Sequence, residues 1–144
     1  MGNPPITSMN KQTICYMKTQ KQITTIPESG VEVILEGVLT RLYFDFKDPD
    51  PTEDGVMAED IKVCESIDVD SRQYDRIVAA IVTDRYSSDA YQAILANYET
   101  AKDKDSELAE DKREEYIKEY SDFQAWRVHA KEIAHIAVTE IESM

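Results

Sequence analysis

The residues with the clearest potential for chemistry are the carboxylates of DPDPTEDGVMAED, residues 48–60, which occupy six of its thirteen positions. Taken as a calcium loop that starts at Asp50, the segment places Thr52 and Asp54 at ligand positions 3 and 5. Position 12, where such loops carry a bidentate Glu, holds Ile61 instead. Because the prolines on either side of Asp50 favour an extended connection, we interpret the segment as a solvated loop and keep Asp50, Thr52 and Asp54 as the weaker calcium candidate.

A second spacing suited to a metal is the E-x-x-H pair of Glu132 and His135. Di-iron helical bundles use this spacing, but they need two copies of it and further inward-facing carboxylates. The sequence has one copy and only two histidines, so we expect no metal and no cofactor. Neither a nucleophile-elbow motif nor a glycine-rich phosphate loop occurs among its four glycines, and we expect no enzymatic activity.

The charge of the chain narrows the class of partner. Its formal net charge is −13, and residues 45–70 hold ten acidic side chains against two lysines. Nucleic acid and anionic membranes both favour clustered Lys and Arg, so neither is an expected partner, and no apolar run approaches the ~20 residues of a membrane span. An alternative function is an acidic decoy or regulator that binds a basic protein through the 45–70 cluster. A cluster in a proline-containing loop is less suited to imitate DNA than carboxylates on a rigid element.

Cysteine usage bears on the compartment. Cys15 and Cys64 are the only cysteines, and no segment resembles a secretory leader. We therefore expect two free thiols in a reducing compartment, with Cys64 buried in a strand.

The first half of the chain has the period of β-strands. Residues 12–70 predict a small antiparallel sheet of about four strands, the last of them around Ile61 to Val69. Apolar side chains occupy odd positions before Gly37 and even positions after it. Since a one-residue slip reverses the faces of a strand, this change predicts a β-bulge or bend at Gly37.

After residue 70 the period changes to that of helices, and we expect three helices between residues 71 and 142. Ser71 is the predicted N-cap of the first helix, and Ser87 or Ser88 caps the second. The third runs from Ser106 nearly to the end; a capping-box pattern at Ser121 allows a break there, but one continuous helix is favoured. The chain is thus predicted to be α+β, with residues 1–9 a loose arm or a cloning remnant and residues 10–144 a single domain.

The last helix carries a seam of aromatic and alanine residues, in which Arg127 occupies one position. Such a seam packs either on the rest of its own chain or on a partner. We expect part of it to project beyond the domain and to support self-association or the binding of another protein. The interface candidates are Phe123, Trp126, Ala130 and Ile133.

Two stretches of the second half carry a family resemblance. YSSDAYQAILAN and EYSDFQAWRVHAK resemble segments of small uncharacterised proteins encoded among the structural genes of Bacteroides-type prophages. The resemblance spans residues 74–138. It implies a phage structural or assembly role, in the host cytoplasm or in the virion. It supplies no catalytic or binding residue.

Overall fold

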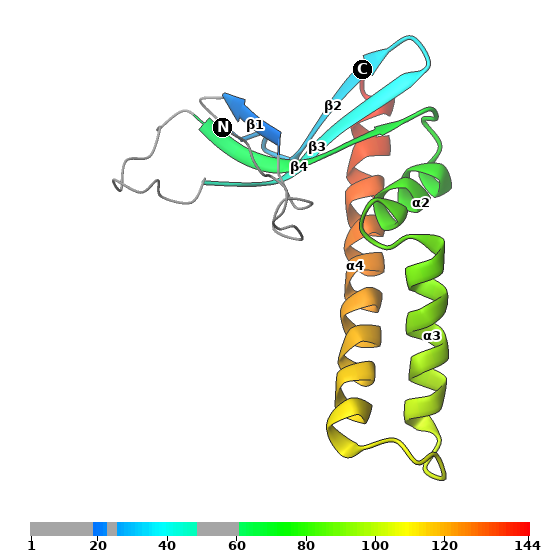
Figure 1. The fold of residues 1–144 in the computed structure, drawn as a ribbon. Coiled ribbons are helices and arrows are strands. Elements are labelled where there is room, and N and C mark those ends of the chain that lie inside the picture. Colours follow the sequence, from blue (N-terminus) through cyan, green and yellow to red (C-terminus); the bar gives the residue numbers. More distant parts are fainter. Residues whose placement is uncertain (1–18, 23–25, 49–60) are drawn as a thin grey trace, which may run out of the picture. The chain divides into compact units, whose positions relative to one another are not determined.

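The computed structural model describes residues 19–22, 26–48 and 61–144 (Figure 1). Its elements, in chain order, are β1 (Thr19–Gln22), β2 (Val31–Glu36), β3 (Leu39–Lys47), β4 (Ile61–Val69), α2 (Tyr74–Arg85), α3 (Ser88–Lys102) and α4 (Glu110–Glu142). This is the predicted α+β order, with a long last helix. The predictions for residues 1–9, for Cys15 and for the calcium candidates Asp50, Thr52 and Asp54 fall outside the described residues.

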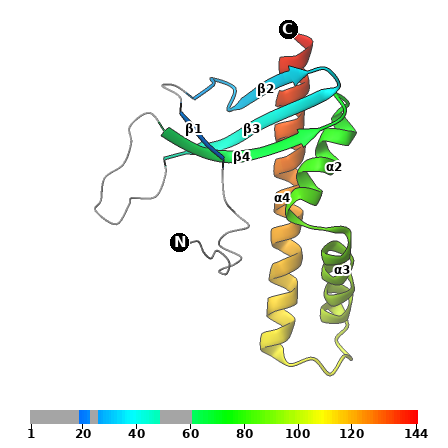
Figure 2. The ribbon, with the colours of Figure 1, turned by 45° about the horizontal axis from the view of Figure 1, so that its top comes forward.

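The strands form one sheet in the order β1-β4-β3-β2. The three longer strands, β2 to β4, run antiparallel to their neighbours and make up its main part (Figure 2). The four-residue β1 pairs antiparallel with β4, which places Thr19 opposite Cys64 and Gln22 opposite Ile61.

The predicted bulge at Gly37 is wrong, because the chain reverses there. Only Gly37 and Val38 separate β2 from β3, and Gly37 has a φ of +59°, as a type II′ turn requires at its first central position. A two-residue loop pairs Glu36 with Leu39, so odd positions of β2 face the same side as even positions of β3. The buried side chains follow this rule: Val31 in β2, and Thr40, Leu42 and Phe44 in β3.

The described residues fall into two compact units, and the boundary between them passes through the strands. Residues 33–41 and 67–144 form what we call the helical unit. The described parts of residues 1–32 and 42–66 form the strand unit.

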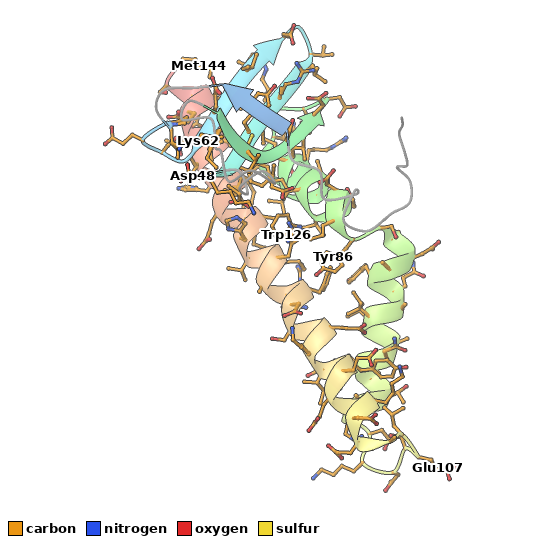
Figure 3. The ribbon with its side chains drawn as sticks, turned by 60° about the vertical axis from the view of Figure 1, so that its left-hand side comes forward. Asp48, Lys62, Tyr86, Glu107, Trp126 and Met144 are labelled. Carbon is orange, nitrogen blue, oxygen red and sulfur yellow. The ribbon has the colours of Figure 1, made fainter. Side chains whose placement is uncertain are left out.

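The strand unit has a small apolar centre. Its buried residues are Val31, Leu42, Phe44 and Cys64, none of them more than 1% exposed. The predicted burial of Cys64 in a strand is confirmed. At the surface, the ammonium group of Lys62 pairs with the carboxylate of Asp48 (Figure 3).

In the helical unit, α2 and α3 follow one another along the length of α4 and both pack against it (Figures 1 and 2). The helix α4 is unbroken over 33 residues, which confirms the favoured prediction of one helix, although it begins at Glu110 rather than Ser106. Ser121 lies inside it. The next residue, Asp122, forms a 2.8 Å ion pair with Lys118, an i,i+4 contact that stabilises the helix locally.

The serine caps were predicted with mixed success. Ser87 caps α3, because its hydroxyl accepts a 3.1 Å hydrogen bond from the backbone N–H of Ala90. Ser71 does not cap α2, whose N-cap is Gln73. The Ser71 hydroxyl instead accepts a 3.1 Å hydrogen bond from the N–H of Gln73, so the serine closes a local turn before the helix begins.

Arg113 holds the connection between α3 and α4, which passes Glu107 (Figure 3). Its guanidinium donates to the carbonyl oxygens of Ala101 at 2.5 Å, Asp103 at 3.1 Å and Ser106 at 3.5 Å. The last carbonyls of a helix lack partners within the helix. A side chain of α4 thus satisfies the end of α3 and fixes the turn between them.

Two polar features of the strand residues in the helical unit have consequences for stability. The Arg41 guanidinium donates to both carboxylate oxygens of Asp68, at 2.8 and 3.2 Å, and lies 3.5 Å from the carboxylate of Glu36. The hydrogen bonds from Arg41 hold the pKa of Asp68 below its usual value. Thr40 is fully buried, and its hydroxyl has no hydrogen-bond partner in the described part of the chain.

We expect Thr40→Val to raise the free energy of unfolding by about 1 kcal/mol, because it removes a buried hydroxyl that lacks a partner and keeps the shape of the side chain. Urea denaturation measures the change. Thr139→Val is the matched control, since the Thr139 hydroxyl is exposed and donates to the carbonyl of His135, and it should change stability by less than about 0.5 kcal/mol. A loss of stability in Thr40→Val would contradict the assignment.

The second prediction concerns pH. Because the folded pKa of Asp68 lies below its ordinary value of 3.8, its ionised form stabilises the fold above that value, and this contribution is lost as the pH falls through the folded pKa. Asp68→Asn should therefore lower the free energy of unfolding by up to about 1 kcal/mol at pH 7 and by nothing measurable near pH 2. The effect at pH 7 is small because the Arg41–Asp68 pair is half exposed. Asp70→Asn serves as the control in urea titrations at both pH values. An equal deficit at both would exclude the ion pair as its cause.

Candidate functional site

A groove on the helical unit is the feature best suited to binding. It has a volume of about 330 Å³ and lies where α2, the start of α3 and the middle of α4 meet. We call it the helical groove. Its lining residues are Asp75, Val78, Ala79, Val82, Thr83, Tyr86, Ser88, Tyr91, Phe123 and Arg127.

The groove exists because α2 is apolar over more than one face. Ile77 and Ile81 are fully buried. Val78 follows Ile77 by one position and Val82 follows Ile81 by one, so each valine is turned by about 100° around the helix from the preceding isoleucine. This second row is only half buried and forms one wall of the groove.

Aromatic rings close the floor of the groove. The ring of Phe123 is 1% exposed. Tyr86 meets it edge to face with centroids 5.0 Å apart, and Tyr91 stacks on it at the same distance with 28° between the planes. Both arrangements suit the charge distribution of aromatic rings, so the three hold one another in place. Tyr91 is 40% exposed and forms the lip.

The groove carries two charges of opposite sign. The half-buried guanidinium of Arg127 donates to the side-chain oxygen of Gln124 at 3.0 Å. On the α2 wall, a carboxylate oxygen of Asp75 accepts from the N–H of Arg76 at 3.1 Å. Neither Asp75 nor Arg127 forms an ion pair with any other residue that the structure describes, so the groove offers a cation and an anion to whatever occupies it.

The four interface candidates of the sequence are buried, and the expectation that they project from the domain is wrong. The exposed fractions are 1% for Phe123, 7% for Trp126, 0% for Ala130 and 5% for Ile133. The reason is that α2 and α3 lie end to end along α4 and so cover a longer part of it than two helices side by side. Of the four, only Phe123 lines the groove.

Trp126 is an internal anchor of the helical unit (Figure 3). Its ring N–H donates to the carbonyl oxygen of Ile81 at 3.2 Å, which joins α4 to the backbone of α2. The guanidinium of Arg85 lies 3.5 Å from the centre of the ring. A buried Trp usually needs a partner for its N–H, and here another helix supplies it.

The metal candidates do not come together. Glu132 lies 3.6 Å from the ring nitrogen of His129 instead of joining His135 in a larger cluster. Across residues 19–22, 26–48 and 61–144, no three His, Cys, Asp or Glu side chains are placed to hold an ion. The same residues contain no helix of the length and apolar character that crossing a membrane requires.

Sequence reasoning missed the groove as a site, because helical period shows that Val78, Val82 and Tyr91 lie on apolar faces but not that these faces stay partly uncovered. Two signals could have found it. The apolar stripe of α2 is wider than one neighbouring helix covers, and Arg127 places a cation on an otherwise apolar seam.

Comparison of the chain with protein-family models, with curated proteins and with solved structures found no match. The resemblance to prophage proteins therefore stays a prediction.

We expect Trp126→Ala to lower the free energy of unfolding by about 3–5 kcal/mol, the cost of emptying a buried aromatic site. Trp126→Phe should lower it by only about 1–2 kcal/mol, since it keeps most of the apolar contact and loses the hydrogen bond to Ile81. Chemical denaturation of both variants tests this, with the exposed Val128→Ala as control. If Trp126→Ala kept its stability but changed its association state, the residue would be an interface anchor after all.

Proposed function

We propose that this chain is a non-enzymatic interaction protein, of phage-derived structural or assembly type, that acts through its helical unit. The observation that carries the proposal is the helical groove, an apolar surface with an ordered aromatic floor and two charges that find no ionic partner among the residues that the structure describes. The resemblance of residues 74–138 to proteins encoded among prophage structural genes supports the phage origin. It also favours the host cytoplasm or the virion as the place of action.

The openness of the groove favours a protein partner over a small molecule. Five of its ten lining residues are exposed: Asp75, Ala79, Thr83, Ser88 and Tyr91. A typical small-molecule site buries 70–90% of its ligand. A groove along a helix that is open on one side suits the apolar face of another helix.

Further apolar side chains of the helical unit face solvent. Tyr74 is 43% exposed and lies one residue before Asp75 of the groove. On α4, Ile117 is 43% and Val128 is 56% exposed. Single exposed apolar residues are ordinary, but several on one unit beside an apolar groove favour a contact surface.

The alternative function, an acidic decoy for a basic protein, has less support. Two of the described carboxylates in the 45–70 cluster already meet cations of the chain itself: Asp48 pairs with Lys62, and Asp68 with Arg41. Such pairing reduces the negative potential that a basic partner would meet. We therefore favour contact through the helical unit.

The test is site-specific photo-crosslinking in cells of the natural host. A benzophenone amino acid replaces Tyr91 at the lip of the groove in one variant and Glu28, an exposed residue of the strand unit, in the control. We expect the Tyr91 variant alone to form a covalent adduct with one defined protein chain, identified by mass spectrometry as a particle component or as the chain itself. Absence of an adduct at Tyr91, or the same set of adducts at both positions, would contradict the proposed function.

A further inference from the structure

We propose that the helical groove receives a second copy of this chain, seated through the outer face of α4. This inference rests on the proposed function and names its partner. It follows from a match in length and in charge between the groove and a part of α4 whose apolar side chains are exposed.

The outer face of α4 carries an apolar row opposite its buried seam. Ile117 and Val128 lie eleven residues apart, which is three helical turns, so their side chains point in nearly the same direction. Ser121, which is exposed, and the half-buried Gln124 lie between them on the same face. We call these four residues the outer row. Two exposed apolar anchors three turns apart on one face form a surface that a groove can receive.

The lengths of the two surfaces agree. The groove follows α2 from Asp75 to Tyr86, again eleven residues, or about 16 Å of helix. The outer row from Ile117 to Val128 covers the same distance. A helix laid along the groove therefore places one apolar anchor near each end.

The charges select a direction. Beyond Val128, Lys131 and Glu132 lie about 100° apart around α4, on either side of the outer row. Lys131 makes no ion pair within the described chain, and Glu132 meets only His129. With Val128 at the Asp75 end of the groove, Lys131 comes within reach of Asp75 on the α2 wall, whereas Glu132 keeps its contact with His129 of its own helix. Ile117 then reaches the aromatic end, beside Tyr86 and Tyr91.

This contact is heterologous, because the groove and the outer row are different surfaces of one unit. Each copy offers one groove and one outer row, so binding continues from copy to copy until a ring closes or a filament grows. Such growth suits an assembly protein. A net charge of −13 opposes it at low salt, and added salt screens that repulsion while leaving the apolar contact in place.

The test uses two variants that each destroy one surface. Ala79→Glu blocks the groove at an exposed lining residue, and Val128→Glu removes an exposed anchor of the outer row. Val38→Glu is the matched control, because Val38 is 80% exposed at the β2–β3 turn and belongs to neither surface. Circular dichroism and thermal melting confirm that each variant folds, with Thr83→Glu as a second groove variant should Ala79→Glu unfold.

Sedimentation at 0.15 and 0.5 M salt gives the outcome. We expect the unaltered chain and Val38→Glu to form species larger than a dimer as concentration rises, more strongly at high salt. Ala79→Glu and Val128→Glu should each weaken association at least tenfold, since a buried charge removes an apolar anchor. Their equimolar mixture should form a one-to-one dimer that does not grow, because one intact groove meets one intact outer row.

Three results would overturn the second copy as occupant: an unaltered chain that stays monomeric up to millimolar concentration, variants that associate like the unaltered chain, or a mixture that fails to dimerise. The crosslinking experiment separates this proposal from the function on which it rests. An adduct between Tyr91 and a different protein would leave the proposed function standing and refute self-assembly, whereas absence of any adduct would contradict both.

Discussion

The helical unit depends on how Trp126 joins α4 to α2. Its ring N–H reaches the carbonyl of Ile81 on the neighbouring helix, and Arg85 of that helix covers the ring. These contacts fix both the distance and the rotation of α2 on α4. Once Ile77 and Ile81 are turned inward, the row one residue later must lie on the flank, about 100° away. The groove is therefore a geometric consequence of the core contact, because the same helix carries apolar residues in both rows.

The order of the elements could be predicted because it is a local property of the chain. Hydrophobic period separates strands from helices at residue 70, Ser87 has the chemistry of a cap, and no Gly or Pro interrupts α4. Gly37 shows the limit of this reasoning. A change of parity is equally consistent with a bulge and with a two-residue reversal, and Val38, a residue typical of strands, favoured the wrong choice. Only the pairing of β2 with β3 distinguishes the two.

The site could not be predicted from the sequence. An apolar stripe on a helix shows that one face of the helix is apolar, but it does not show which neighbouring element covers that face. Phe123, Trp126, Ala130 and Ile133 are buried by the placement of α2 and α3 end to end along α4, a relation that period and composition do not encode. The outer row was overlooked for the converse reason, since two exposed apolar residues three turns apart are unremarkable in sequence. Arg127 was the one local signal, a cation on an apolar seam.

Arg127 also differs from other cations of the helices in how its charge is paired. Several other cations of these helices pair with a carboxylate one turn away, as Lys102 does with Glu99 and Lys118 with Asp122. Arg127 instead lies half buried in an apolar wall with a neutral amide as its partner. Partial burial of a charge without a counter-charge costs free energy. Sites at which a sequence breaks such local consistency are more often functional than accidental, and a carboxylate from another chain would supply the counter-charge that Arg127 lacks among the described residues.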